Sequence, residues 1–560
     1  MNNVSIPSLF EGFSPLEQAA VLAYLNLPPV GGFADVDGPP NPALNDGCEL
    51  PASLRAALRP RRERLGKFSS AADFDGIDGF GPADMLLLQN KVREYPRFGN
   101  RVRPVWGGPE GEREFFALLE SAERYIHIYT FILGGDVGMR VAELLARKMQ
   151  EGVEVRLMFC ASGFVISGSP SGTGFVSRWS ALRSWAVNDM YVRKRLVRYL
   201  DEHDVPYLNN VPIGRHWYRK SFRDAGVKSA AAYERFMRDR GIPDAWLNEQ
   251  ARIDAESGAS FANVDHRKMV IVDGDRAFIG SQNIADSYFY ANELDPDPAI
   301  NVRNWQWHDN SAVLEGPAVS VLSREFAARW MLLGGDRFDW EDSFYTPPPR
   351  PVGTAVVNVV SSIPGALKVP FKANFGRIVR SFFGADARPL SFGDHPIRSR
   401  VLQLPALAAS DFYVEHCYPS DSALLEHWAR LAPSVKDFTM VVPFHYDTKV
   451  LGMECDRMYP ELLRAGIRLA GYERAIVHSK IAVVDGWYTA AGSYNLTLRS
   501  ARADLETEFF IQCAEYGGAV RRLIEQDMTL SSPVKPTLAH RFRSRFSLPV
   551  FDAVVRYFIL

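Results

Sequence analysis

Two distant stretches of the chain carry the same reactive side chains in the same order. The first holds His266, Lys268, Asp273, Ser281 and Asn283, and the second holds His478, Lys480, Asp485, Ser493 and Asn495. An imidazole beside an ammonium group suits an anionic substrate, and a neutral imidazole is a competent nucleophile when a carboxylate fixes its tautomer. We therefore predict catalytic roles for the His, Lys and Asp residues of both stretches, with each Asp either orienting a ring or shaping a turn.

The residues around these side chains indicate how they are positioned. Residues 269–272 and 481–484 are short apolar runs that end in Asp-Gly, which is typical of buried strands followed by turns. Side chains i and i+2 of an extended chain share a face, so each His should point the same way as its Lys. In the G-S-x-N that follows, Gly lets the backbone approach a ligand, and Ser281, Asn283, Ser493 and Asn495 could donate hydrogen bonds to a phosphate. Two such half-sites facing each other would surround one phosphate without a metal or another cofactor.

The duplicated pattern, H-x-K-x-x-x-x-D followed by G-S-x-N, resembles the signature of the phospholipase D superfamily. Neighbouring residues are similar to those of its bacterial cardiolipin synthase branch: Asp309 precedes Glu-Gly-Pro at 315–317, and N-L-T-L-R-S at 495–500 precedes Glu506. The resemblance covers residues 102–164, 264–334, 356–364 and 395–530. A lone H-x-K carries little information, whereas two complete copies in the same order are a strong signal.

This resemblance implies an α/β fold of two phospholipase D-like lobes, each a mixed β-sheet flanked by helices, related by pseudo-twofold symmetry. It implies a phosphodiester transfer in two steps through a phosphohistidine, in which one His attacks phosphorus and the other acts as acid and base. We favour His266 as the nucleophile and His478 as the acid and base, and the similarity of the two motifs leaves the reverse assignment open. The two Lys and two Asn residues would stabilise charge on the phosphate oxygens. By the match to the family pattern, Asp309 and Glu506 are expected to be the partners of the imidazoles, and Arg499 a brace for the second site.

The favoured substrate under this resemblance is a glycerophospholipid, whose phosphatidyl group passes to phosphatidylglycerol or another alcohol. A hydrolytic phospholipase D is the first alternative, because the motifs do not separate transfer from hydrolysis. A metal-independent phosphodiesterase nuclease is the second. It is favoured by a weak similarity of residues 68–85 to a helix-hairpin-helix element and disfavoured by the formal net charge of −2. A non-enzymatic lipid-binding scaffold fits least, because both motifs are intact.

The order of predicted elements divides the chain into five parts. Residues 1–100 form a helical region with helices at 15–25 and 52–65, and residues 101–350 form the first lobe with an insertion at about 163–261. A linker at 351–394 contains a basic, aromatic segment, 365–384. The second lobe spans 395–535 and an amphipathic tail 536–560. Within the lobes, the periodicity predicts helices at 115–122, 137–150, 420–431 and 455–465, and strands at 125–132, 153–159, 411–415, 438–443 and 466–470.

Composition indicates a folded enzyme of several domains. The 560 residues are 47% apolar and 23% charged, and the five cysteines are scattered without metal-binding or disulfide spacing. We see no Sec-type signal and no apolar run of the roughly 18 residues that a spanning helix needs. We therefore expect a cytoplasmic protein that is peripherally associated with the membrane, with phospholipid as its partner and nucleic acid disfavoured. Its anchors would be the segment 365–384 and the tail, although packing of either onto the protein explains the same residues.

Overall fold

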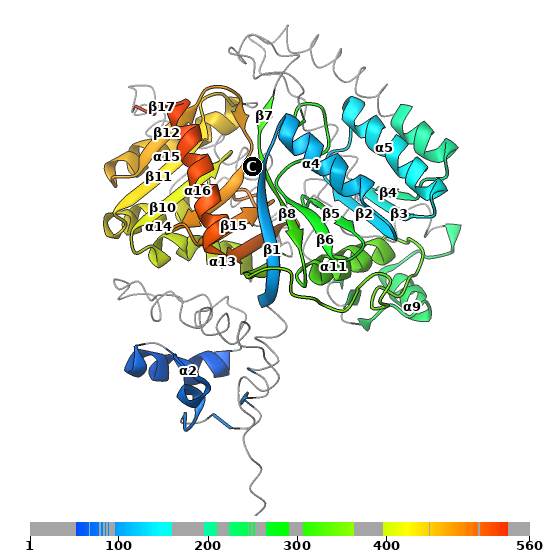
Figure 1. Cartoon of the computed structure of the whole chain (residues 1–560), viewed down its shortest axis with the longest axis horizontal. Coiled ribbons are helices and arrows are strands. Elements are labelled where there is room, and N and C mark those ends of the chain that lie inside the picture. The colour runs from blue at the N-terminus through cyan, green and yellow to red at the C-terminus, as the bar shows by residue number, and fades with distance from the viewer. Residues whose placement is uncertain are drawn as a thin grey trace, which may run out of the picture.

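The computed structural model describes residues 52–159, 195–209, 222–251, 265–289, 306–362, 396–446 and 449–535, with short gaps inside the first, third and last ranges. Two α/β lobes lie side by side, with strand β1 between them (Figure 1). The first lobe runs from β1 to helix α11, residues 96–332, and the second from β9 to β17, residues 355–533.

Fifteen strands form one continuous mixed sheet. The first lobe contributes β1 (Pro96–Trp106), β2 (Tyr125–Thr130), β3 (Glu154–Phe159), β4 (Tyr207–Asn209), β5 (Met269–Val272), β6 (Arg276–Gly280) and β8 (Asn310–Glu315). The second lobe contributes β9 (Ala355–Ser361), β10 (Asp411–His416), β11 (Asp437–Pro443), β12 (Arg468–Tyr472), β14 (Lys480–Val484), β15 (Tyr488–Gly492), β16 (Thr507–Gln512) and β17 (Ser531–Pro533). A separate parallel pair, β7 (Trp307–His308) and β13 (Ile476–Val477), joins the lobes near the sheet.

The strand order repeats across the molecule. Read from its outer edge, the first lobe is β4-β3-β2-β5-β6-β8-β1, and the second, inside β17, is β12-β11-β10-β14-β15-β16-β9. In each lobe the outer three strands are parallel and the rest antiparallel. This equivalence, with β1 antiparallel to β9 at the centre, confirms the predicted pair of related α/β lobes. Their fusion into a single sheet was not predicted.

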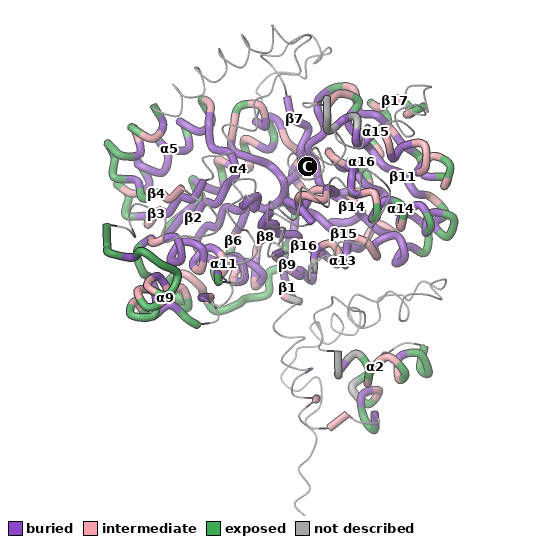
Figure 2. The backbone as a smooth tube through the Cα atoms, turned by 180° about the vertical axis from the view of Figure 1, so that it is seen from behind, coloured by how far each residue is buried: buried purple, intermediate pink, exposed green. Residues whose placement is uncertain are grey.

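Helices cover both faces of the sheet because its central strands are apolar on both sides. Among the described residues, the first lobe includes the helices α4 (Pro109–Glu120), α5 (Gly135–Gln150), α9 (Ala230–Asp239) and α11 (Val319–Leu332), and the second includes α13 (Pro396–Gln403), α14 (Ser422–Leu431), α15 (Lys449–Arg464) and α16 (Ala514–Thr529). Along β5, Val270 and Val272 belong to the apolar cluster that contains α4 and α5, whereas Met269 and Ile271 belong to the cluster that contains α11. This alternation places the motif strand in the buried middle of the molecule (Figure 2).

Most predicted elements are present, with shifted ends. The helix predicted at 115–122 already begins at Pro109, because Pro is favourable in the first turn of a helix. The strand predicted at 466–470 is instead Arg468–Tyr472, since Gly466 has a φ of 89° and belongs to the turn that ends α15. The predicted helix Ala52–Leu65 is present as α2.

Some predicted features fall outside the described residues: the helix at 15–25, much of the insertion at 163–261, the segment 365–384 and the tail from 536. Just after α2, the carboxylate of Asp73 accepts hydrogen bonds from the backbone amides of Ser69 and Ser70, as in a capped turn. In the part of the chain that is described, no helix combines the length and apolar character needed to cross a membrane.

Candidate active site

Each motif histidine is held by backbone contacts to the opposite lobe. The amide of His266 donates to the carbonyl of Leu505 (2.9 Å), and the amide of His478 donates to the carbonyl of His308 (2.7 Å). Both histidines stand immediately before the central strand of their own lobe, β5 or β14. The pairing therefore brings the starts of two strands, more than 200 residues apart in the sequence, to the junction of the lobes.

The imidazole rings are oriented by carboxylates that also come from the opposite lobe. Nδ1 of His478 lies 2.7 Å from Oδ2 of Asp309, and Nδ1 of His266 lies 3.1 Å from Oε2 of Glu506. Both carboxylates have no exposed surface. An ionised carboxylate can only accept, so Asp309 or Glu506 in its ionised form places the proton on the Nδ1 that it contacts and leaves Nε2 for chemistry. The geometry is the one that the family pattern implied for Asp309 and Glu506.

The serines of the two G-S-x-N motifs hold these carboxylates. Oγ of Ser493 donates to Oε2 of Glu506 (2.5 Å), and Ser500 donates to Oε1 of the same residue (2.6 Å). In the first lobe, Oγ of Ser281 donates to Asp309. A hydroxyl has one proton to donate, and here it goes to a carboxylate, so phosphate binding by Ser281 and Ser493 stays a prediction. They fix the groups that orient the rings.

The turn carboxylates Asp273 and Asp485 have structural roles. Asp273 accepts from the amides of Glu123, Arg124 and Tyr125. Asp485 accepts from the three amides at positions 409–411. Both residues have positive φ, 53° and 47°, which Asp tolerates in tight turns. Of the two roles predicted for these residues, this geometry matches the one in the turn: each ties the turn after its motif strand to the start of the neighbouring strand.

The two ammonium groups lie beside the rings. Nζ of Lys268 donates to the carbonyl of His266 (2.5 Å), and Nζ of Lys480 donates to the carbonyl of His478 (2.6 Å). Both side chains are almost fully buried. Burial, together with the neighbouring charge of Lys480, lowers the pKa of Lys268 to about 7, against the opposing effect of Glu506. The i, i+2 spacing thus places each Lys next to its His, as predicted.

The charges of both lysines act on both imidazoles, which places these four side chains close together. Burial is the main cause that lowers the pKa of His266 well below its usual value, followed by the charges of Lys268 and Lys480. For His478, burial and the same two charges outweigh Asp309 and lower the pKa to about 3. Before substrate binds, both rings are therefore neutral, and an anion between the ammonium groups would favour their protonation.

The two orienting carboxylates differ in charge. Burial raises the pKa of Glu506 to about 7, although Lys268 opposes this. Burial also disfavours the charge of Asp309, but His478 and Lys480 hold the pKa of this carboxyl below its usual value. Asp309 is thus the firmer anionic partner, and His478 is the ring better supported as an imidazolium.

The motif amides and Arg499 have partners near the pocket. Nδ2 of Asn283 donates to the hydroxyl of Tyr288 (2.8 Å), and Oδ1 of Asn495 accepts from Sγ of Cys417 (3.0 Å). Arg499 pairs with Asp504 at 2.9 Å, and its charge lowers the pKa of His266. Phosphate binding by the two Asn residues stays a prediction. The electrostatic effect of Arg499 is on the pocket around His266.

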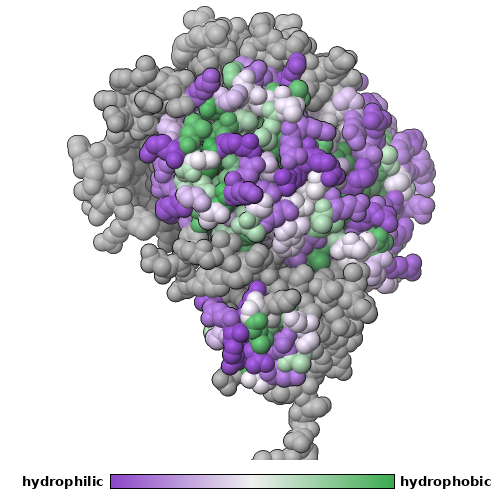
Figure 3. Space-filling view, turned by 60° about the vertical axis from the view of Figure 1, so that its left-hand side comes forward, coloured by the Kyte–Doolittle hydropathy of each residue, from purple (hydrophilic) through white to green (hydrophobic). Residues whose placement is uncertain are grey.

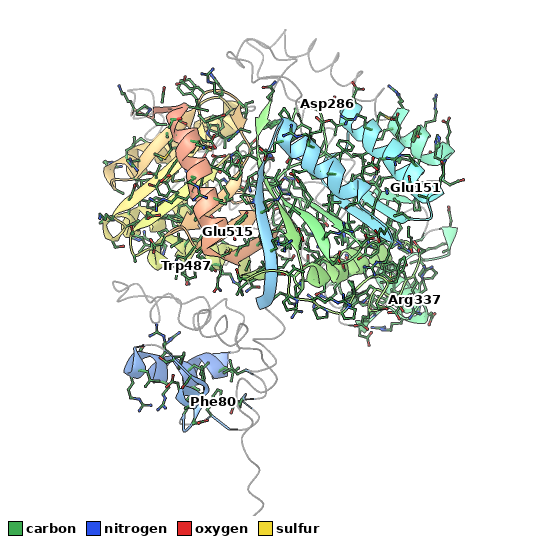
Figure 4. The ribbon with its side chains drawn as sticks, in the orientation of Figure 1. Phe80, Glu151, Asp286, Arg337, Trp487 and Glu515 are labelled. Carbon is green, nitrogen blue, oxygen red and sulfur yellow. The ribbon has the colours of Figure 1, made fainter. Side chains whose placement is uncertain are left out.

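Aromatic residues that sequence analysis missed wall the pocket. Phe131 meets His266 edge to face, with ring centroids 4.9 Å apart, and Tyr288 and Trp307 meet His478 in the same way at 5.3 and 5.1 Å. Trp307 lies two residues before Asp309, and Tyr288 five after Asn283, so proximity to the motifs was a usable signal. Asp286, labelled in Figure 4, fastens the loop after the first motif to α5 by accepting from the amide of Val137 at 2.8 Å.

Two related α/β lobes that share one pocket with two crossed His–carboxylate pairs and two buried lysines define an enzyme of the phospholipase D superfamily. Residues 115–295 and 406–528 match the family model described as the cardiolipin synthase, phospholipase D-like domain. The chain belongs to this family.

Relatives and solved structures carry related names. A cardiolipin synthase of Geobacillus kaustophilus is 23% identical over 79% of this chain and 68% of its own length. A probable cardiolipin synthase of Bacillus subtilis, YwiE, is 20% identical over 85% of this chain and 76% of its own. The crystal structure of a phosphatidylserine synthase from Haemophilus influenzae covers 84% of this chain and 99% of its own, at 11% identity and a TM-score of 0.49.

Proposed function

We propose that this protein is a phosphatidyltransferase of the cardiolipin synthase type, which moves a phosphatidyl group from one alcohol to another through a phosphohistidine. The observation that carries the proposal is the crossed pair of oriented imidazoles, His266 with Glu506 and His478 with Asp309. In each pair the carboxylate contacts Nδ1, and Nε2 of His478 lies 3.4 Å from Nζ of Lys480. The names of the relatives favour a glycerophospholipid as the substrate class.

In the first step, Nε2 of His266 attacks phosphorus and the bond from phosphorus to the leaving alcohol breaks. His478 gives the proton from its Nε2 to the oxygen of that alcohol, which leaves neutral. Asp309 suits His478 to this role because an ionised carboxylate 2.7 Å from Nδ1 stabilises the imidazolium. The resting His478 is neutral, so the anionic phosphodiester must promote its protonation on binding.

In the second step, the neutral His478 takes the proton of the acceptor hydroxyl, whose oxygen attacks phosphorus. The bond between phosphorus and Nε2 of His266 breaks, and His266 returns to its neutral form. Lys268 and Lys480 stabilise the charge on the phosphate oxygens in both transition states, in a buried pocket where such interactions are strong. Water in the place of the acceptor alcohol would give hydrolysis by the same steps.

We further propose that the protein works at a membrane surface, because both proposed substrates are lipids. In the view of Figure 3, apolar side chains of the described residues lie in several patches among hydrophilic ones. Sedimentation with liposomes tests this part of the proposal, and a variant without residues 365–384 tests the predicted anchor. Unchanged sedimentation of that variant would remove the anchor from the proposal.

Lipid analysis of cells that overproduce the protein tests the reaction. We expect new cardiolipin or a related phosphatidyl-alcohol with the intact protein, and none with His266→Ala or His478→Ala. We also expect activity to persist in EDTA, since lysines supply the positive charge. Release of phosphatidic acid alone would indicate a hydrolytic phospholipase D. Unchanged lipids together with cleavage of single-stranded DNA would replace the proposal with the nuclease alternative.

A further inference from the structure

A buried group of three titratable side chains lies directly behind His478. Nε2 of His308, on β7, is 2.9 Å from Oδ2 of Asp527 on α16 and 3.5 Å from Oε1 of Glu415 on β10. The indole Nε1 of Trp106 donates to the same Asp527 oxygen at 3.0 Å. All three titratable side chains are at most 9% exposed. We call His308, Glu415 and Asp527 the rear cluster.

The equivalent position behind His266 is occupied by different residues. Leu505 is the counterpart of His308, because each precedes the orienting carboxylate and each carbonyl accepts the amide of a motif histidine. On the neighbouring strand, Tyr129 is the counterpart of Glu415. In the sheet, Tyr129 lies opposite Met269, which follows Lys268, and Glu415 lies opposite Ile481, which follows Lys480.

The group behind His266 also carries a different charge. In it, the carboxylate of Asp265 pairs with two guanidinium groups, those of Arg267 at 2.8 Å and Arg329 at 3.4 Å, and Arg267 also lies 3.6 Å from Glu325. Two guanidinium groups therefore balance two carboxylates behind the first histidine, whereas two carboxyl groups face one imidazole behind the second. This difference gives the two halves of the pocket different electrostatic surroundings, although their motifs are alike.

The charges of the rear cluster balance only if one carboxyl is protonated. Two buried carboxylates and one imidazolium would leave an excess negative charge, and among the described residues no Arg or Lys pairs with either carboxylate. Both carboxyl oxygens of Glu415 are buried and, as acceptors, have no hydrogen-bond partner. A proton on Glu415 removes the excess charge and lets this group donate to Asp527.

Electrostatics support this assignment of protons. Burial, reinforced by Asp527, raises the pKa of Glu415 well above its usual value. Burial lowers the pKa of His308, but Asp527, Glu415 and Asp309 outweigh it and raise this pKa to about 9. Burial likewise opposes the charge of Asp527, yet His308 keeps the pKa of this carboxyl below its usual value.

We propose that the rear cluster, with Glu415 protonated, is a positioning element for Asp309 and His478, and so for proton transfer rather than nucleophilic attack. The ring of His308 is fixed by Asp527 and stacks on Tyr472, with centroids 4.4 Å apart. Its carbonyl accepts the amide of His478, and the next residue is Asp309 itself. Fixing this one residue therefore fixes both members of the acid and base pair.

The inference rests on the proposed function, and two substrates separate it from a general loss of structure. Phosphatidylglycerol has a poor leaving group that must be protonated, whereas phosphatidyl-p-nitrophenol releases a stable anion without a proton. In His308→Gln, we expect the first step to slow roughly 10- to 100-fold with phosphatidylglycerol, the size of effect that slight misplacement of a catalytic group produces. The p-nitrophenol burst should change by less than about 3-fold, since it needs no general acid.

His203→Gln is the matched control, because it removes an imidazole that stacks on Tyr199 at the surface. It should leave both rates unchanged. Equal slowing of both substrates by His308→Gln would overturn the positioning role. An inactive wild-type protein would instead refute the proposed function.

A second variant tests the proton on Glu415 without using activity alone. The amide of Glu415→Gln can donate to Asp527 as the protonated carboxyl does, so we expect the melting temperature and the phosphatidylglycerol rate to stay close to those of the wild type. A large fall in melting temperature would mean that Glu415 is ionised. The same three side chains could instead ligate a divalent cation, so stoichiometric metal in the purified protein, lost in Glu415→Gln, would also overturn the proposal.

Discussion

Oδ2 of Asp309 lies 2.7 Å from Nδ1 of His478, although 169 residues separate them in the sequence. The reciprocal contact, from Glu506 to His266, spans 240 residues. Each lobe thus supplies a histidine for one half of the pocket and the carboxylate that orients the histidine of the other half. The lobes are incomplete as catalysts when taken separately.

Replacing Asp309 should damage the chemistry without comparable damage to the fold. In Asp309→Asn, we expect kcat to fall by roughly 10² to 10⁴, because the amide cannot stabilise an imidazolium and favours the wrong tautomer. Asp273→Asn is the matched control. It weakens a cap on three amides, so unfolding should become easier by about 1–3 kcal/mol while kcat stays nearly constant. A loss of kcat in Asp273→Asn, together with a nearly normal kcat in Asp309→Asn, would contradict our assignment of the carboxylates.

The roles of the two histidines can be separated with phosphatidyl-p-nitrophenol. Because this leaving group needs no proton, His478→Ala should still release a burst of p-nitrophenol and retain a phosphorylated protein. His266→Ala should give neither. Rapid quench followed by detection of the acid-labile phosphohistidine provides the measurement. A stable phosphoprotein in His266→Ala, and none in His478→Ala, would exchange the two roles.

Binding of an anion should take up protons. In the free pocket the pKa of His478 is about 3 and that of Lys268 about 7, and a bound anion raises both. Calorimetry with tungstate at a pH of about 7.5, in buffers of different ionisation enthalpy, should therefore show net proton uptake. Lys268→Met should reduce this uptake. If the heat of binding is the same in all buffers, binding takes up no protons. That result would show that the groups of the pocket are already protonated before the anion binds.

The buried ammonium group of Lys268 should cost stability. Its pKa is about 7 in the folded protein and 10.5 as the reference, so the unfolded chain binds more protons between these values and stability rises with pH across that window. Lys268→Met should abolish this contribution and raise the melting temperature most clearly at or below a pH of about 7. The exposed Lys436 provides the control Lys436→Met, for which the dependence on pH should match that of the wild type.

The sequence was most informative where its own pattern repeated. The spacing of His266 and Lys268 predicted their shared face, because a strand has a period of two, and the apolar run Met269–Val272 is a strand with the predicted bounds. The family pattern also supplied Asp309 and Glu506. Contacts that join separate parts of the chain were harder to foresee, and the fused central sheet, with β1 beside β9, is one of them.

The contacts of the motif side chains could not be read from the repeat. Ser281 and Asp273 belong to the repeated motif, yet one hydroxyl holds a carboxylate and one carboxylate caps backbone amides. A repeat shows that a residue type is needed, and it does not show which neighbour the side chain meets after folding. The aromatic wall from Trp307 and Tyr288 was missed because aromatic residues outside a repeated pattern are usually assigned to the core.

Strand β1 bonds to β8 of its own lobe along one edge and to β9 of the other along its opposite edge. This ladder stiffens the junction against hinge motion, and separating the lobes would also pull each carboxylate away from its ring. Exchange of the spent alcohol for the incoming one must therefore occur with the junction closed. Opening of the junction is then not part of turnover, so enzyme tethered across the β1 and β9 strands by a crosslink should keep its turnover rate.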